Sequence, residues 1–272
     1  MALRRAVLAA VIGVSMIFAT ATAAGADQHG DNHHGDHDGH TTVCAGGPFA
    51  PGTYGSVVVT GFCMTTPGVF TIKGSLTIAP NGGLDATNCD SHVTVRDGIL
   101  VLPGGVLGLG GSVNGTGCAA DTNDVVRGGL HAFLPIGVIV HGTQINDGFA
   151  VLGGGGWTDC TKNVPGLPFP PYTDIEDSQI NGGASIAGMS TCWMGFIRNQ
   201  VHGDVRIDNN TMGDPDAIEI GLNTIQGDLH CRGNQIDPAV GGPGGVPTNS
   251  FDGSPANPNT VSGEETGQCK GL

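Results

Sequence analysis

The sequence has few charged and few aromatic side chains. Of its 272 residues, 12% are charged and 5% aromatic, whereas glycine occurs 49 times and proline 16 times. So little charge is typical of β-structure and turns rather than of exposed helices. Glycine does not recur at every third position, which excludes collagen. Short Val, Ile and Leu runs through the middle of the chain argue against disorder.

Basic side chains are scarce as well. Lysine and arginine number 10 against 24 acidic residues, so the formal net charge is −14. Such a chain repels nucleic acids and anionic membranes, and we expect neither as a partner. Cations and neutral polymers, such as an extracellular or cell-wall glycan, are the partners that this charge favours.

Common catalytic motifs are missing. The sequence contains no G-x-S-x-G, no H-E-x-x-H and no G-x-x-x-x-G-K-[ST], and no two of its cysteines form a C-x-x-C pair. These absences argue against the corresponding hydrolase, metalloprotease, nucleotide-binding and redox sites. We therefore expect no catalytic residues.

A long apolar run occurs only at the start of the chain. It follows Arg4 and Arg5 and ends at Ala24-Gly25-Ala26, small residues that fit an A-x-A cleavage site. We predict a signal peptide over 1–26 and a secreted, extracellular protein; the alternative is an uncleaved membrane anchor. Cleavage would remove two arginines and no acid, so the charge would become −14 − 2 = −16, and we expect no membrane partner afterwards.

Residues 27–41 follow as a hydrophilic tail without large apolar side chains. Imidazoles beside carboxylates suit Zn²⁺, Cu²⁺ or Ni²⁺, so the tail is a candidate metal site, although its glycines also fit a plain disordered spacer. The candidate ligands are His29, His33, His34, His37 and His40.

A repeated frame organises the rest of the chain. The residues NQVHGDVRID (199–208) and NTIQGDLHCR (223–232) share N-x-[VI]-x-G-D-[VL], and SQINGGASIA (178–187), TQINDGFAVL (143–152) and NTVSGEE (259–265) restate it. Upstream, 72–86 aligns with 95–109 without a gap. Apolar residues alternate within each copy, as in half-buried strands, and a repeat of 20–25 residues indicates a solenoid.

The frame resembles that of exported bacterial right-handed parallel β-helix proteins. We predict an all-β, disulfide-braced solenoid over 42–272, with coils of about 21–24 residues and insertions near 153–174 and 236–258. Small polar residues in the first column, such as Asn199 and Asn223, would hydrogen-bond along the axis at a corner; a row of asparagines that contacts substrate is the alternative. The β-helix enzymes of this resemblance act on acidic polysaccharides, but their motif sets find no match here.

The eight cysteines of an exported chain predict disulfides. Each coil of a solenoid contacts only its neighbours, so cysteines close in sequence should pair. The expected pairs are Cys44–Cys63, Cys89–Cys118, Cys160–Cys192 and Cys231–Cys269.

Three other groups carry possible chemistry. Three acids from neighbouring copies of the frame would stack as an acidic column. The repulsion between these like charges would be relieved by Ca²⁺, or by nearby arginines and water. The acids of 212–221 could cleave a glycoside or simply form a turn. The aromatics of the proline-rich insertion could bind a glycan or cover the core. These groups are Asp204, Asp228 and Glu264; Asp214, Asp216 and Glu219; and Trp157, Phe169 and Tyr172, with Trp193 nearby.

The predicted function is therefore structural or adhesive, without catalysis, at the cell surface or in the medium. The alternatives are a polysaccharide-active enzyme or glycan-binding module of the same fold, and metal binding through the tail. Nothing in the sequence indicates the oligomeric state.

Overall fold

The structure is a computed structural model, and it describes residues 40–272 apart from 166, 168, 215–217, 240–246 and 251–255. The predicted signal peptide and His29, His33, His34 and His37 lie outside the described residues. The described part of the chain is all-β and contains no helix. Accordingly, no helix long and apolar enough to cross a membrane occurs among these residues.

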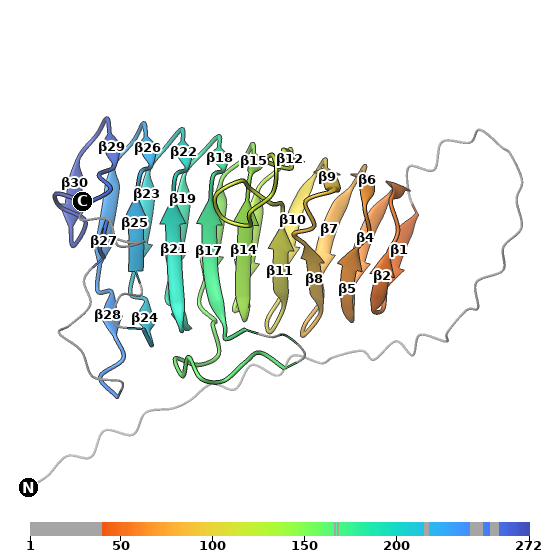
Figure 1. Cartoon of the computed structure of the whole chain (residues 1–272), viewed down its shortest axis with the longest axis horizontal. Helices are drawn as coiled ribbons and strands as arrows, with labels where there is room; N and C mark the ends of the chain where they lie inside the picture. Colours follow the sequence, from red (N-terminus) through yellow and green to blue (C-terminus); the bar gives the residue numbers. More distant parts are fainter. Residues whose placement is uncertain (1–39, 166, 168, 215–217, 240–246, 251–255) are drawn as a thin grey trace, which may run out of the picture. The chain divides into compact units, whose positions relative to one another are not determined.

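Thirty strands form four parallel sheets, here named A to D (Figure 1). Sheet A contains β1 (Thr41–Cys44), β4 (Ser56–Val59), β7 (Ser75–Ile78), β10 (Gly98–Val101), β13 (Leu130–Phe133), β16 (Phe149–Leu152), β19 (Ala184–Ala187), β23 (Val205–Asp208), β27 (Leu229–Arg232) and β30 (Glu265–Gly267). Sheet B contains β2 (Gly47–Phe49), β5 (Phe62–Thr65), β8 (Gly83–Ala86), β11 (Val106–Leu109), β14 (Gly137–His141), β17 (Tyr172–Glu176), β21 (Trp193–Ile197) and β25 (Ile218–Gly221). Sheet C contains β3 (Gly52–Tyr54), β6 (Gly68–Ile72), β9 (Ser91–Val95), β12 (Asp124–Val126), β15 (Thr143–Ile145), β18 (Gln179–Ile180), β22 (Gln200–Val201), β26 (Thr224–Ile225) and β29 (Thr260–Val261). Sheet D contains β20 (Ser190–Thr191), β24 (Thr211–Met212) and β28 (Gln235–Ile236).

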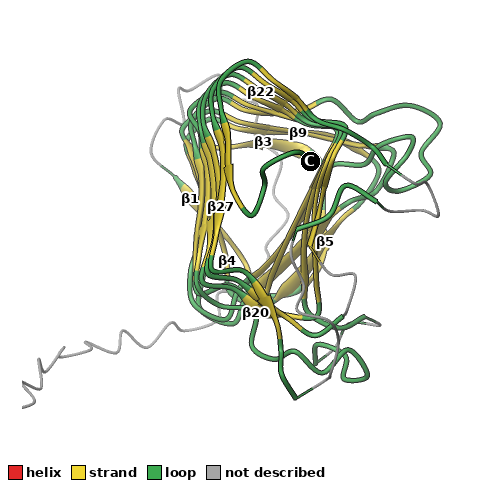
Figure 2. Cartoon of the chain, turned by 90° about the vertical axis from the view of Figure 1, so that its left-hand side faces the viewer, coloured by secondary structure: helices red, strands yellow, loops and turns green. Residues whose placement is uncertain are grey.

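Successive strands pass from sheet A to sheet B to sheet C and back to A, so each turn of the chain is one coil. In the coils of β19, β23 and β27, a short strand of sheet D directly follows the strand of sheet A. Figure 2 shows sheets A and B as the two facing sides, with sheet C joining them. The coils wind in the right-handed sense, as parallel crossovers almost always do. The predicted right-handed parallel β-helix is therefore confirmed.

Coil length varies more than the sequence analysis predicts. The predicted 21–24 residues hold for three coils, three other coils are shorter, with 15 or 19 residues, and three carry long segments and have 31 to 36 residues. Between paired residues of sheet A, the offsets are 15 (Thr41–Ser56), 19 (Val57–Leu76), 23 (Leu76–Ile99), 31 (Ile99–Leu130), 19 (Leu130–Phe149), 35 (Phe149–Ala184), 21 (Ala184–Val205), 24 (Val205–Leu229) and 36 (Leu229–Glu265).

The core follows the predicted alternation. In β23, Val205 and Ile207 are buried inside the coil and Arg206 is exposed. Neighbouring coils place Leu229 on Val205 and Cys231 on Ile207. Stacking thus produces the continuous apolar interior that no single coil could bury alone.

A buried asparagine ladder follows the corner between sheets B and C. The N–H of Asn199 donates to Oδ1 of Asn223 at 2.8 Å, and the N–H of Asn223 donates to Oδ1 of Asn259 at 3.1 Å. The side-chain amide of Asn223 donates to the carbonyl of Phe196 at 2.7 Å. The predicted axial hydrogen bonding is therefore confirmed for this column.

A second ladder, which the sequence analysis does not predict, follows sheet A at the other corner. The N–H of Asn210 donates to Oδ1 of Asn234 at 3.1 Å, and the N–H of Asn234 donates to Oε1 of Gln268 at 2.8 Å. A residue with positive φ precedes each residue of this second ladder, namely Asn209, Gly233 and Gly267. The two ladders satisfy backbone groups that the bends remove from the sheets.

All four predicted disulfides are present: Cys44–Cys63, Cys89–Cys118, Cys160–Cys192 and Cys231–Cys269. Disulfides of this number indicate an oxidising compartment. Two of them attach long segments to the body, because Cys118 lies in 110–123 and Cys160 lies in 153–171. The segment 110–123 is a third insertion, beside the two expected from the sequence.

Candidate functional site

The outer face of sheet B carries the polar cluster of interest. Alternate residues of each strand point into the core, as Val138 and Val140 do in β14, so Ile139 and His141 point outward. In the next coil, β17 directs Tyr172, Asp174 and Glu176 to the same face. Pairing places His141 beside Glu176 and Ile139 beside Asp174.

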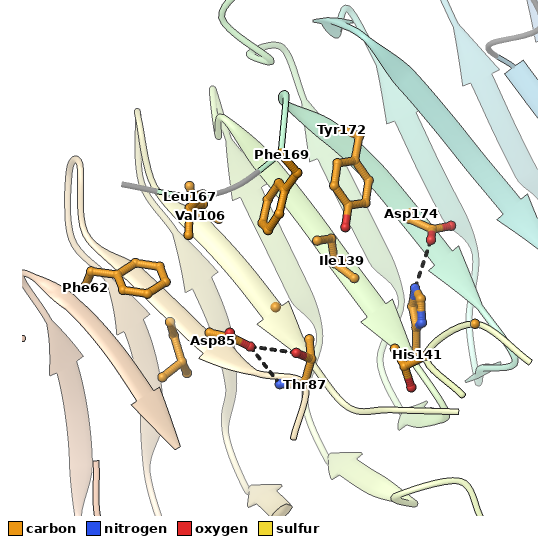
Figure 3. A pocket seen from close by; sticks show the side chains of 14 residues that line it. Phe62, Asp85, Thr87, Val106, Ile139, His141, Leu167, Phe169, Tyr172 and Asp174 are labelled. Atoms are coloured by element: carbon orange, nitrogen blue, oxygen red, sulfur yellow. Dashed lines mark hydrogen bonds and ion pairs between the residues drawn. The ribbon is translucent and has the colours of Figure 1, made fainter. Parts of the chain in front are cut away.

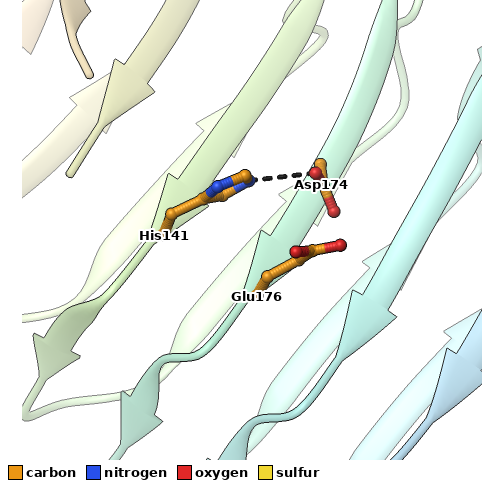
Figure 4. Close-up of side chains that lie close together, drawn as sticks. All are labelled: His141, Asp174 and Glu176. Carbon is orange, nitrogen blue, oxygen red and sulfur yellow. Dashed lines mark hydrogen bonds and ion pairs between the residues drawn. The ribbon is translucent and has the colours of Figure 1, made fainter. Parts of the chain in front are cut away.

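His141, Asp174 and Glu176 form the centre of this cluster (Figure 4). Nε2–H of His141 donates to Oδ2 of Asp174 at 2.9 Å. One donor atom from each of the three residues lies within 4.8 Å of the others. Their exposed fractions are 3%, 7% and 7%, although all three lie on the outside of the sheet. The segment 110–123 explains this burial, because a Cβ at its Gly115 would lie 2.5 Å from Nδ1 of His141.

Two further charged residues complete the cluster. Arg198 forms a hydrogen-bonded ion pair with Glu176, and its Nε donates to Oδ1 of Asp177 at 2.7 Å. The other oxygen of Asp177 accepts a 2.7 Å hydrogen bond from Oγ of Ser112, which ties the covering segment to the cluster. Asp177 and Arg198 both have positive φ, 52° and 57°. Leu222 has the same conformation at the equivalent position of the next coil, with φ 58°, so the positive φ belongs to this corner of the coils.

Burial dominates the electrostatics of the two central carboxyls. It raises the pKa of Glu176 to about 7, with a further increase from the charge of Asp174 and a decrease from Arg198. It also raises the pKa of Asp174, which the hydrogen bond from His141 only partly offsets. Burial would lower the pKa of His141, but its contact with Asp174 outweighs this and raises it.

Asp177 behaves in the opposite way. Burial pushes the pKa of Asp177 upward, but hydrogen bonds from Arg198 and Ser112 outweigh this effect and the pKa is lowered. The contacts with Arg198 and Ser112 therefore favour the ionised form of Asp177, whereas burial favours the protonated forms of Asp174 and Glu176.

Two buried atoms of the cluster have no hydrogen-bond partner, namely Nδ1 of His141 and Oδ1 of Asp174. Most buried polar side-chain atoms in proteins are paired, and each exception calls for an explanation. Gly115 adjoins the first of these atoms. A side chain there would enter the space between Nδ1 of His141 and Oε2 of Glu176, at 2.5 and 2.7 Å from them.

Two hollows flank the cluster and share Gly115. The first, of about 180 Å³, is reached by His141 and Asp174 and is lined by Phe62, Phe169 and Tyr172 (Figure 3). The second, of about 660 Å³, is reached by Glu176 and Arg198 and is lined by Trp193. A third hollow shares Phe62, Val106 and Leu167 with the first, so the first hollow adjoins both the second and the third along sheet B.

Aromatic rings continue from one hollow to the next. The ring centroids of Phe169 and Tyr172 are 5.3 Å apart, and those of Tyr172 and Trp193 are 6.3 Å apart. Tyr172 and Trp193 are also direct partners in neighbouring strands. Three of the four aromatics singled out in the sequence thus lie together, whereas Trp157 lines none of these hollows and donates to the carbonyl of Lys162.

The other predicted site residues are dispersed. Asp204, Asp228 and Glu264 do stack, but the N–H of Asp228 donates to Asp204 at 3.0 Å and the N–H of Glu264 donates to Asp228 at 2.9 Å, so backbone donors already relieve their repulsion. His40 is exposed, and the remaining tail ligands lie outside the described residues. Asp216 also lies outside them. Glu219 is on β25 and lines the second hollow.

The sequence analysis misses His141, Asp174, Glu176 and Arg198. The repeat alignment contains the signal, because Ile145 matches Ile180 and Val201. Four residues before Ile145 and Ile180, the same register pairs His141 with Glu176. Arg198 lies in the next coil, directly after the residue that pairs with Glu176. What the alignment does not contain is the cover provided by 110–123, which turns these exposed positions into a buried cluster.

No protein-family model, curated protein or solved structure matches the chain. The site is therefore interpreted from its own residues.

Proposed function

We propose that the protein is an exported, glycan-active β-helix protein that holds a neutral or cationic polysaccharide along the outer face of sheet B. The observation that carries this proposal is the combination, in one groove, of an aromatic row with a buried charged cluster. Sugar rings offer apolar faces that stack on aromatic side chains and hydroxyls that hydrogen-bond to charged groups. The aromatic rings that could stack on sugars are those of Phe169, Tyr172 and Trp193. The charged groups that could bond to hydroxyls are those of Asp174, Glu176 and Arg198.

The form of the groove favours a polymer over a small ligand. The adjoining hollows involve sheet B from β5 to β25, which are six strand spacings apart in the order of that sheet. At ~4.8 Å per spacing this corresponds to ~29 Å, enough for several sugar rings. Acids along the groove, with a chain of net charge −14, disfavour an acidic polysaccharide.

The cluster is the proposed reactive centre. Burying several charges is costly, and apolar residues of similar volume would commonly stabilise a fold as well or better. The asparagine ladders meet their hydrogen-bonding needs, whereas the cluster leaves atoms of His141 and Asp174 unpaired. Polar groups retained in this state are typical of sites that act on a ligand.

A non-catalytic structural or adhesive role, as first expected from the sequence, stays a prediction. This role also assumes an exported solenoid that binds a glycan. It differs from the proposed function only in that the glycan is not cleaved. Binding of a polysaccharide without release of reducing or unsaturated ends would favour adhesion, and their release would favour the enzyme.

The two tryptophans allow a matched test of binding. In Trp157→Phe the remaining Trp193 reports from the groove, and in Trp193→Phe the remaining Trp157 reports from outside it. We expect the fluorescence of Trp193 alone to respond when neutral polysaccharides (cellulose, xylan, mannan, chitin) or cationic chitosan are added, with little response to pectin or alginate.

Affinity provides the second arm. Trp193→Ala should weaken binding of the responding polysaccharide at least ~10-fold, as loss of a central aromatic anchor does, while Trp157→Ala should leave it unchanged. An equal response of both tryptophans, or none to any polysaccharide, would refute the proposed groove.

A further inference from the structure

We propose that His141, Asp174 and Glu176 bind one divalent transition-metal ion, of which Zn²⁺ and Mn²⁺ are the representative choices. The inference deepens the proposed function, on whose groove it rests, by naming the cofactor of the reactive centre. It concerns a site distinct from the histidines of the tail.

The donor atoms fit such an ion in kind and position. One imidazole and two carboxylates form a mixed nitrogen and oxygen set of the type that first-row divalent metals prefer. Ligands at about 2.0–2.2 Å from an ion in tetrahedral geometry lie ~3.3–3.6 Å apart. One ligand atom from each of the three residues already lies within 4.8 Å of the others, so the side chains need to close by up to ~1.5 Å to hold the ion.

The composition of the cluster points in the same direction. Three carboxyl groups, those of Asp174, Glu176 and Asp177, gather beside one guanidinium, that of Arg198, which already pairs with Glu176 and Asp177. The ion-pair partner of Asp174 is the imidazole of His141, and a divalent cation would supply the positive charge that this buried place lacks.

Free lone pairs are the independent observation. Nδ1 of His141 and Oδ1 of Asp174 are buried without a partner, on side chains that are 4% and 10% exposed. Nε2 of His141 is the ring nitrogen that faces Asp174, at 2.9 Å, so the ion would bind Nε2 in place of this hydrogen bond. At Gly115, only a glycine leaves room between Nδ1 of His141 and Oε2 of Glu176.

The ligand set also excludes the alternatives. Ca²⁺ and Mg²⁺ take oxygen ligands, so an imidazole at the centre of the set disfavours them. Three protein ligands leave a coordination position free, as in catalytic rather than structural metal centres. The cluster borders both hollows, so that position is accessible to water or to a sugar hydroxyl in the groove.

The test must separate this site from the tail. A tail variant of the full chain carries His→Asn at positions 29, 33, 34, 37 and 40. A second variant adds Asp174→Asn and Glu176→Gln to it. A third, the matched control, instead adds Asp204→Asn and Asp228→Asn in the acidic column, where an amide oxygen can still accept the backbone hydrogen bonds. Each is loaded with Zn²⁺ and dialysed, and zinc per chain and the thermal unfolding midpoint are measured.

We expect the tail variant and the control to retain one zinc per chain and to unfold several degrees higher with Zn²⁺ than without it, because an ion bound only by the fold stabilises the fold. The cluster variant should lose both effects. Its unfolding without metal shows that it is folded. Absence of zinc from the tail variant, equal zinc in the cluster variant, or preference for Ca²⁺ would overturn the inference.

Failure of the metal site and failure of the groove are distinguishable. Fluorescence of Trp193 in the Trp157→Phe variant, recorded after chelation, reports glycan binding without metal. A response there, together with no zinc in the tail variant, would refute the metal site and leave the groove intact.

Discussion

Asn223→Ala should destabilise the protein strongly, although the side chain it removes is small. Oδ1 of Asn223 accepts from both the N–H and the side-chain amide of Asn199, and Nδ2 of Asn223 donates to the carbonyl of Phe196 and to Asn259. The substitution removes all four hydrogen bonds. It leaves the N–H of Asn199 without its acceptor and the carbonyl of Phe196 without this donor, in a place where Asn223 is 1% exposed.

Each buried group left unpaired costs about 1–3 kcal/mol. Two such groups give a loss of ~2–6 kcal/mol in the free energy of unfolding. At 2–4 °C per kcal/mol for a domain of this size, a loss near ~3 kcal/mol lowers the melting temperature by ~6–12 °C.

The assay is thermal unfolding followed by circular dichroism, with Thr224→Ala as the control. Thr224 is the next residue along the chain and is exposed at the same corner, so its substitution should change the stability by less than ~0.5 kcal/mol. Equal melting temperatures for the two variants would show that the ladder does not hold the coils together and would refute the reasoning.

Three other results are expected. Val205→Asp should cost several kcal/mol, because it buries a charge without a partner, whereas Arg206→Ala should stay within about 0.5 kcal/mol of the wild type; equal melting temperatures would show the alternation to be wrong. Burial raises the pKa of Asp124 to about 7, against 3.8 ordinarily. The stability that the protonated carboxyl contributes is therefore fully present below pH ~4 and is lost as the pH rises toward 7. The melting temperature of the wild type should therefore fall over this range relative to that of Asp124→Asn, and parallel curves would contradict this. Replacing Cys231 and Cys269 by alanine opens a link between residues 38 apart and should cost ~2–5 kcal/mol, measured by urea unfolding; an unchanged midpoint would show that the final coil is held without the disulfide.

The fold was predictable because a solenoid repeats its physical requirements in every coil. Three features recur in the sequence at nearly constant spacing. They are the glycine of the frame, such as Gly203 and Gly227, the apolar alternation in β23 and β27, and the asparagine column. The same reasoning predicts the disulfides, since only neighbouring coils come within bonding distance.

The site was not predictable in the same way, because it depends on departures from the repeat. Gly115 and Ser112 belong to an insertion that no other coil shares, and its path over His141 cannot be obtained from the periodicity. The second ladder was missed for a related reason. Asn210 and Asn234 lie two residues beyond the ends of the frames at 208 and 232, and the next member of this ladder is Gln268, a different residue type.

The central claim is that the cluster serves function rather than stability. Its most direct test is the double variant Asp174→Asn with Glu176→Gln, compared with the wild type in two measurements on the same protein. These are the thermal unfolding midpoint without added metal, and the release of reducing or unsaturated ends from the polysaccharide that changes Trp193 fluorescence. We predict a midpoint close to that of the wild type, because the amides can still accept hydrogen bonds from His141 and Arg198 and Asp177 remains as the charged partner of Arg198, together with loss of the released ends. A marked fall in the midpoint with undiminished turnover would show that the cluster only holds the fold together.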